Sequence, residues 1–159
     1  MVHTMITSKL DYCNAILYIW SARVNAKVLH QGSEYPACFI SQHGKYEHII
    51  PVLKQYHWLP IRQRIHYKVL MLTFMSLNGL APTYLEELMK RRPMKRTRAN
   101  GNNDLVIPDI KHKSFGGRSV GYGGPKLWNT LPKELKTCTN INAFKKFLEA
   151  FLFEEAYLH

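Results

Sequence analysis

A basic segment near the middle of the chain, KRRPMKRTR at 90–98, is the densest group of residues that could do chemistry. Long Lys and Arg side chains at this density neutralise phosphates and release counterions without reading bases. A polar stretch at 99–103 follows, so we interpret the segment as an exposed linker. It could equally serve as a nuclear import signal or only as a solvated, solubilising linker. The candidate nucleic-acid contacts are Lys90, Arg91, Arg92, Lys95, Arg96 and Arg98.

Four aromatic residues could stack on bases beside these cations: Trp58, Tyr84, Tyr122 and Trp128. Each of them lies in an apolar pattern, which favours packing in a core over contact with a ligand.

Metal-ligand chemistry has little support in the sequence. The three cysteines, Cys13, Cys38 and Cys138, are far apart and odd in number, which argues against a disulfide scaffold and a four-Cys zinc site. Cys38 also lies in a stretch with three histidines, but the spacing fits no zinc pattern. That stretch contains His43, His48 and His57. We therefore expect no metal and no cofactor.

Catalytic motifs are also missing from the sequence. There is no phosphate-binding loop of the G-x-x-x-x-G-K-[ST] type and no G-x-G-x-x-G. The Gly-rich stretch at 116–125 is not followed by the long helix that a phosphate cradle needs. The eleven acidic residues form no pair suited to two-metal nucleotidyl transfer. We expect no catalytic residue, no small-molecule substrate and no independent enzyme.

The composition describes a basic chain with enough apolar residues to form a core. Among 159 residues, 46% are hydrophobic, and 22 Lys and Arg against 11 Asp and Glu leave a net charge of +11. This balance favours an anionic partner, nucleic acid before a membrane surface. No apolar run approaches the roughly 18–20 residues that span a bilayer. The N-terminus lacks the pattern of a signal peptide, so we expect an intracellular protein, with a nuclear location possible.

The elements that would position the basic segment are mostly helical. The hydrophobic period is strongest over 61–78, where Pro60 precedes and Gly79 follows the expected helix. Its apolar stripe consists of Ile61, Ile65, Val69, Leu72 and Met75. Further helices are expected over 4–20, 46–56, 82–91 and 141–157. In the last of these, Asn140 is the predicted N-cap, and the apolar side comprises Ile141, Phe144, Leu148, Phe151 and Leu152.

Between residues 104 and 121 the pattern changes to short strand candidates. These candidates are 105–107, 114–115 and 119–120, and helical turns are expected at 125–131 and after Pro132. The predicted fold class is mainly α, with a helical half, a small β element and a C-terminal helix.

Several motifs together resemble the region that follows the palm in non-LTR, Jockey-like retrotransposon reverse transcriptases. They occur in the family's order over nearly the whole chain, and in combination they are highly specific. The matching blocks are SKLDYCNAILY at 8–18, HIIPVL at 48–53, HWLPI at 57–61, RI at 64–65, LNGLAPTYL at 77–85, FG at 115–116, RS at 118–119, PKLWNTLP at 125–132 and FK at 144–145.

The resemblance implies a thumb-like region and a C-terminal tail. In the family, catalysis belongs to the palm and to an endonuclease, and neither is expected here, so no catalytic residue carries over. The chain departs from the family at 29–38, where Gly32 and Pro36 replace helix-compatible residues at a cost of about 1 and 3 kcal/mol. This departure puts the integrity of the thumb in doubt.

The expected organisation has four parts. They are a degenerate thumb-like segment at 1–45, a helical hairpin region at 46–92, a basic and polar linker at 93–103, and a tail at 104–159. The resemblance implies a truncated, catalytically incomplete remnant of an RNA-directed DNA polymerase that retains non-specific contact with an RNA or DNA backbone. The alternatives are a protein-interaction module and an inert, decayed fragment.

Overall fold

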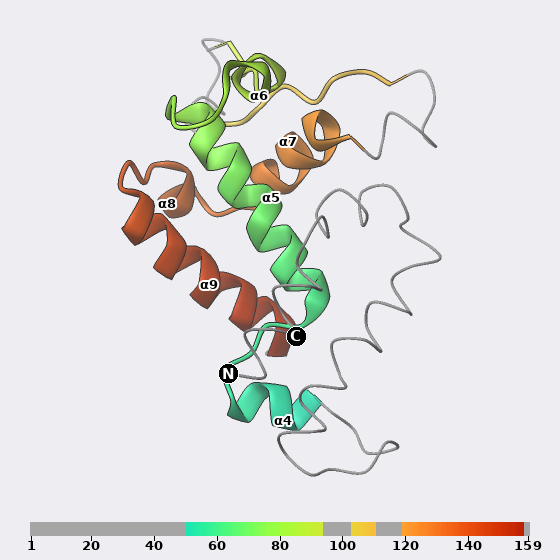
Figure 1. Ribbon diagram of the computed structural model, residues 1–159, viewed down its shortest axis with the longest axis vertical. Helices are drawn as coiled ribbons and strands as arrows, with labels where there is room; N and C mark the ends of the chain where they lie inside the picture. Colours follow the sequence, from blue (N-terminus) through green and yellow to red (C-terminus); the bar gives the residue numbers. More distant parts are fainter. Residues whose placement is uncertain (1–49, 94–102, 111–118, 158–159) are drawn as a thin grey trace.

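The computed structural model describes residues 50–93, 103–110 and 119–157. This part of the chain is mainly helical, as predicted (Figure 1). Its helices are α4 (Ile50–Gln55), α5 (Ile61–Leu77), α6 (Thr83–Leu88), α7 (Val120–Thr130), α8 (Lys133–Lys136) and α9 (Ile141–Tyr157). The expected helix at 4–20, the departure at 29–38 and the strand candidate at 114–115 lie outside the described residues. None of the helices described has the length and apolar character needed to cross a bilayer.

Helix α5 begins where the sequence predicted and ends at Leu77, one residue before the predicted end. Pro60 is the residue before its first turn, where a missing N–H costs no hydrogen bond. At the other end Gly79 has φ of +68°, and the Leu80 N–H donates to the Met75 carbonyl at 2.9 Å. This 6→1 bond is that of a Schellman motif, which needs a left-handed residue after the helix. Glycine adopts that conformation without a Cβ penalty.

The buried face of α5 differs from the predicted stripe. Ile65 and Val69 are buried as expected, but Leu72 and Met75 are only half-buried, while Leu70 and Phe74 are fully buried. The reason is that two helices pack against α5, with α7 on one side and α9 on the other. The residues that face this pair of neighbours are therefore buried, and the 3.6-residue period alone could not select them.

A core of aromatic and aliphatic side chains joins α5, α7, α8 and α9. The rings of Phe74 and Phe144 stack with their centroids 4.2 Å apart, and the Trp128 ring lies 5.9 Å from Phe144. Rings at these separations contribute about 0.5–1.5 kcal/mol per pair beyond their burial. This core connects residues of the expected hairpin region with residues of the expected tail.

Helix α9 has the bounds that the sequence predicted and runs antiparallel beside α5 (Figure 1). The Asn140 side chain accepts a hydrogen bond from the Asn142 N–H at 2.8 Å, so the predicted N-cap is confirmed. Phe144, Leu148 and Leu152 are buried on the predicted side, and Ile141 and Phe151 pack half-buried against the core.

Helix α7 corrects the prediction for the Gly-rich stretch. The strand candidate at 119–120 is wrong, because Val120 starts a helix that contains Gly121, Gly124 and Pro125 in its first two turns. Glycine and proline are poor helix formers, so local propensity opposes this helix. The close approach of α7 to α5 outweighs that preference: a Cβ on Gly124 would lie 2.8 Å from the Thr73 hydroxyl.

The strand candidate at 105–107 is also wrong as a strand. In the described residues the β contribution is one antiparallel bridge, between Arg91 and Leu105. No second strand can pair with the other edge of Leu105, because a side chain of α7 occupies its backbone groups.

Of the two shorter helices, the one expected at 82–91 is shorter than predicted. Within the described residues the helix expected at 46–56 is α4, with Pro51 in its first turn as expected. The helix expected at 82–91 ends at Leu88, because the next residue, Met89, leaves the helical conformation with ψ of 83° and its side chain enters the core. Lys90 and Arg91 therefore lie beyond α6 and not in its last turn.

Candidate nucleic-acid interface

The first three residues of the basic segment are exposed, but their backbone is hydrogen-bonded to another segment of the fold. Lys90, Arg91 and Arg92 follow α6, and their backbone pairs with 104–106. The Arg92 N–H donates to the Asp104 carbonyl at 2.9 Å, and the Val106 N–H donates to the Lys90 carbonyl at 2.8 Å. Residues 90–92 are therefore part of the folded region, whereas we had interpreted the whole segment 90–98 as an exposed linker. Lys95, Arg96 and Arg98 lie outside the described residues.

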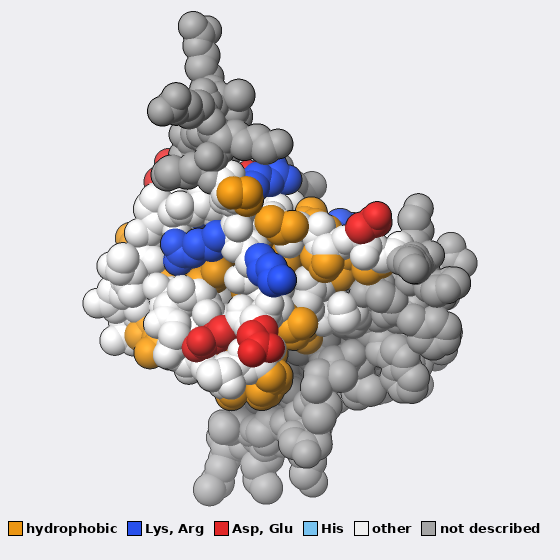
Figure 2. Space-filling model, turned by 90° about the horizontal axis from the view of Figure 1, so that it is seen from above, with side chains coloured by type: hydrophobic (Ala, Val, Ile, Leu, Met, Phe, Trp, Pro, Cys, Tyr) orange, Lys and Arg blue, Asp and Glu red, His pale blue; other side chains and the backbone are white. Residues whose placement is uncertain are grey.

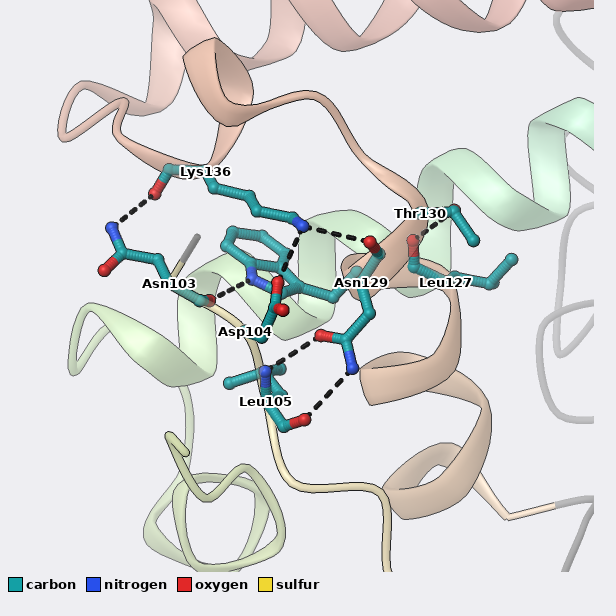
Figure 3. A network of polar contacts seen from close by, with 8 residues as sticks. Asn103, Asp104, Leu105, Leu127, Asn129, Thr130 and Lys136 are labelled. Carbon is teal, nitrogen blue, oxygen red and sulfur yellow. Dashed lines mark hydrogen bonds and ion pairs between the residues drawn. The ribbon is translucent and has the colours of Figure 1, made fainter. Parts of the chain in front are cut away.

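The attachment point is Leu105, which is fully buried between the basic segment and α7. The Asn129 side-chain amide makes both hydrogen bonds that a neighbouring strand would make. Its Oδ1 accepts from the Leu105 N–H at 2.8 Å, and its Nδ2 donates to the Leu105 carbonyl at 3.0 Å (Figure 3). All backbone polar groups of this buried residue are thereby satisfied.

A buried lysine, Lys136, belongs to the same hydrogen-bond network as Asn129 and Leu105. The Lys136 side chain is only 3% exposed, and its Nζ donates to Asp104 Oδ1 at 2.9 Å and to the Asn129 carbonyl at 3.0 Å (Figure 3). The Trp128 Nε1–H donates to the Asn103 carbonyl at 3.0 Å. Sequence reasoning missed Lys136 and Asp104, since a lysine in KELK has the pattern of an exposed helical residue. For Asn129 and Trp128 the sequence did offer a signal, because both belong to the motif PKLWNTLP at 125–132.

Arg91 has a structural partner as well as an exposed position. Its Nη2 donates to the Leu77 carbonyl at 3.3 Å, at the C-terminal end of α5. A cation there complements the partial negative charge of the helix end. Of the three described cations, Arg91 therefore helps to hold the turn, and Lys90 and Arg92 are the better candidates for an external phosphate.

Tyr84 was expected in the core and is instead 64% exposed on α6. Leu88, one turn later, and Leu80, just before the helix, are exposed too. The reason is that α6 is short and none of its residues is buried, so its apolar side chains lie on the surface. Figure 2 looks onto this end of the molecule and shows Lys and Arg side chains among hydrophobic ones, with acidic side chains nearby.

The other aromatic candidates follow the packing expectation more closely. Trp128 is buried in the core, whereas Trp58 and Tyr122 are half-buried. Only Tyr84 thus combines an exposed ring with a position on the helix that leads into the basic segment.

Among the described residues there is no group of three or more His, Cys, Asp or Glu side chains that could hold a metal ion. His57 of the weighed ligand set stacks on Phe153 with ring centroids 5.1 Å apart. Cys138, the free cysteine of this part of the chain, donates its thiol to the Glu134 carbonyl at 3.3 Å. The other members of the weighed ligand set, Cys38, His43 and His48, lie outside the described residues.

Comparison with family models, with curated proteins and with solved structures gives no match to this chain.

Proposed function

We propose that the described helices form the non-catalytic, thumb-and-tail part of a protein of the non-LTR reverse transcriptase type, and that the basic segment 90–98 contacts RNA or DNA phosphates without base readout. In this proposal the protein acts inside the cell, where RNA and DNA are found, and a nuclear location is compatible with contact to DNA.

The arrangement of the motif residues supports the structural half of this proposal. Gly79 of LNGLAP makes the left-handed turn after α5, and Trp128 and Asn129 of LWNTLP hold the segment 103–105. These residues act in folding, since they end a helix or hold a backbone segment in place.

The observation that supports nucleic-acid binding is the exposed position of Lys90 and Arg92 on a hydrogen-bonded backbone, directly after the helix that carries exposed Tyr84. A cation held on a fixed backbone loses less freedom on contacting a phosphate than one on a loose chain. An exposed aromatic ring adds a surface on which any base can stack, which is the usual partner of a basic groove in sequence-independent binding.

The test is the salt dependence of binding to a short duplex DNA and to single-stranded RNA. Contact with three to five phosphates gives a log–log slope of about −2 to −4.5. Replacing all six cations of the segment by Gln should flatten this slope and weaken binding equally across sequences. The double variant Lys90→Gln/Arg92→Gln should reduce the slope on duplex DNA by about 1.8, because two contacts are lost.

The matched control is Lys126→Gln/Lys133→Gln, which removes the same charge from exposed positions on α7 and α8. Its slope should remain close to that of the parent chain. If both double variants reduce the slope equally, only net charge matters. If the six-Gln variant binds with unchanged affinity and slope, the segment is a solubilising linker and the inert-fragment alternative stands.

The protein-interaction alternative rests on the exposed apolar side chains Leu80, Tyr84 and Leu88. A docking surface of this kind would be sensitive to Leu88→Gln and insensitive to salt. The nucleic-acid proposal makes the opposite prediction for RNA binding, which should fall with salt and remain unaffected by Leu88→Gln.

A further inference from the structure

A groove of about 230 Å³ lies between α8 and the middle of α9, two helices that lie side by side (Figure 1). Its lining residues come from 132–135 and from 147–154. The volume is below the about 300–1,000 Å³ of sites that enclose a whole small molecule. It suits a single bulky side chain of a partner, which is how anchor residues bind at protein interfaces.

The α8 side of the groove is held in place by two buried residues. Leu135 is 4% exposed in the core, and Lys136 belongs to the polar network of Figure 3. Because these two side chains are buried, Glu134 lies on the exposed side of this single helical turn. Pro132 and Leu135 give this side of the groove an apolar surface.

Helix α9 carries a second apolar stripe beside the one that packs in the core. Phe147, Ala150 and Phe151 follow at three- and four-residue steps and line the groove. The Phe147 side chain is 60% exposed. A single exposed apolar side chain is common on protein surfaces, whereas apolar side chains that line a groove together are typical of a binding site.

The charges that line the groove are acidic, although the chain as a whole has a net charge of +11. They are the exposed carboxylates of Glu134 on α8 and Glu154 on α9. Neither carboxylate is in an ion pair within the described part of the chain. Lys133 and Lys146 neighbour lining residues in the sequence but do not line the groove. Two carboxylates repel phosphates and attract cations, so the groove suits a basic protein segment and not a nucleic acid.

We propose that this groove is a docking site for a protein segment that carries one bulky apolar side chain flanked by Lys or Arg. The apolar side chain packs against Phe147 and Phe151, and the flanking cations lie beside Glu134 and Glu154. The apolar anchor supplies most of the affinity, and the charges at the edge supply specificity. The groove contains no residue of the basic segment 90–98, so this site goes beyond phosphate contact and does not depend on it.

The probe is a synthetic pentapeptide with a central phenylalanine and two lysines on each side, blocked at both ends. Two matched peptides replace the phenylalanine by alanine or the lysines by glutamates. Amide chemical shifts of the isotope-labelled full chain report each titration. We expect shifts at 132–135 and 147–154, and binding about tenfold tighter than that of either matched peptide. No shift there at millimolar peptide, or equal affinity for the phenylalanine and alanine peptides, would overturn the proposal.

The contribution of the two carboxylates is tested by Glu134→Gln/Glu154→Gln. This variant should bind the basic peptide about threefold to tenfold more weakly, because two solvent-exposed charge contacts are lost. Glu87→Gln/Glu155→Gln is the matched control, since it removes the same charge from exposed positions that do not line the groove. An equal loss in both double variants would mean a general charge effect and would overturn the site.

The apolar wall is tested by Phe147→Ala, which should weaken peptide binding about tenfold. Its thermal midpoint should stay unchanged, because the side chain is largely exposed. If that variant does not fold, Ala150→Lys gives a second test. Lysine suits an exposed helical position, and here it places a long chain and a like charge in the groove. Unchanged affinity in the folded groove variants would overturn the proposal.

Two further measurements test other occupants. Sedimentation equilibrium that shows a dimer of the parent chain and a monomer for Phe147→Ala would assign the groove to a second copy and overturn the proposed partner. A short oligonucleotide that shifts the groove amides would overturn it as well. The Lys90→Gln/Arg92→Gln variant should bind the peptide like the parent chain. Failure of the basic-segment function is therefore distinguishable from failure of the groove.

Discussion

At the scale of single residues, the ion pair of Lys136 and Asp104 holds the exposed basic turn in place. The Lys136 side chain is buried, and the Asp104 side chain is 26% exposed. Removing one partner of a buried pair is strongly destabilising, because the other charge stays in a poorly solvated position. The pair therefore links the stability of the core to the position of Arg92, whose N–H is bonded to the Asp104 carbonyl.

Lys136→Met should lower the free energy of unfolding by ~2–3 kcal/mol, because partial exposure of Asp104 moderates the cost. Lys133→Met, on the exposed side of α8, is the control and should change the free energy by less than ~0.5 kcal/mol. Urea unfolding of both variants measures the difference. Similar losses in the two variants would contradict a structural role for the pair.

His66 predicts a pH dependence of stability. Burial, and secondly the Arg62 charge, lower the pKa of its imidazole from 6.5 to about 4. The unfolded chain therefore binds more protons than the folded chain between these values, so stability is complete above pH 6.5 and falls as the pH drops toward 4. The difference in pKa corresponds to at most ~3 kcal/mol, which solvent access reduces to ~1–2 kcal/mol.

The measurement is the free energy of unfolding of the parent chain and of His66→Gln between pH 4 and 7. The variant should lose less stability than the parent over this range, while the other seven histidines contribute equally to both. If the free energies of unfolding of the two proteins fall equally with pH, His66 is not the source of the pH dependence.

At the scale of elements, α7 packs closely on α5 at Gly124. A Cβ at Gly124 would lie 2.8 Å from the Thr73 hydroxyl and 2.9 Å from the Met89 Cε, both of which belong to buried side chains. Thr73 cannot move away easily, because its hydroxyl donates to the Val69 carbonyl at 2.9 Å. The small residue permits the helices to approach at this point.

Gly124→Ala should destabilise the protein by ~1–3 kcal/mol, since the added methyl forces α7 away from α5. Gly121→Ala is the matched control in the same helix, where the Cβ would meet Leu88 at an ordinary 3.5 Å. That control should be neutral or stabilise by up to ~1 kcal/mol. The denaturant midpoints of the two variants measure the difference. A Gly124→Ala variant as stable as the parent chain would contradict the close crossing.

At the scale of the whole molecule, α5 organises the described residues. Its two faces carry α7 and α9, and α6 follows at its C-terminal end (Figure 1). The basic turn follows α6 and lies toward the C-terminal end of α5, which is about 25 Å long.

The proposed non-catalytic role predicts that the purified chain does not extend a primer in the presence of Mg²⁺. Two-metal nucleotidyl transfer needs paired carboxylates, and the sequence contains no such motif. The assay uses a primed RNA template and a competent reverse transcriptase as positive control. Magnesium-dependent extension by the chain alone would overturn this role.

The sequence by itself determined the features that depend on local periodicity and on end signals. The bounds of α9, the Asn140 cap and the Gly79 turn all follow from residues within one or two helical turns of each other. Such features need no knowledge of a distant partner. The mainly helical class followed for the same reason.

Tertiary structure decided what depends on partners distant in sequence. Whether Leu72 or Phe74 is buried depended on the placement of α7 and α9, and the lack of space for a side chain at Gly124 depended on Thr73 and Met89. The 105–107 segment is not a strand because Asn129, 24 residues later, binds its backbone. Burial of Lys136 required the same kind of long-range contact, for which no local pattern exists.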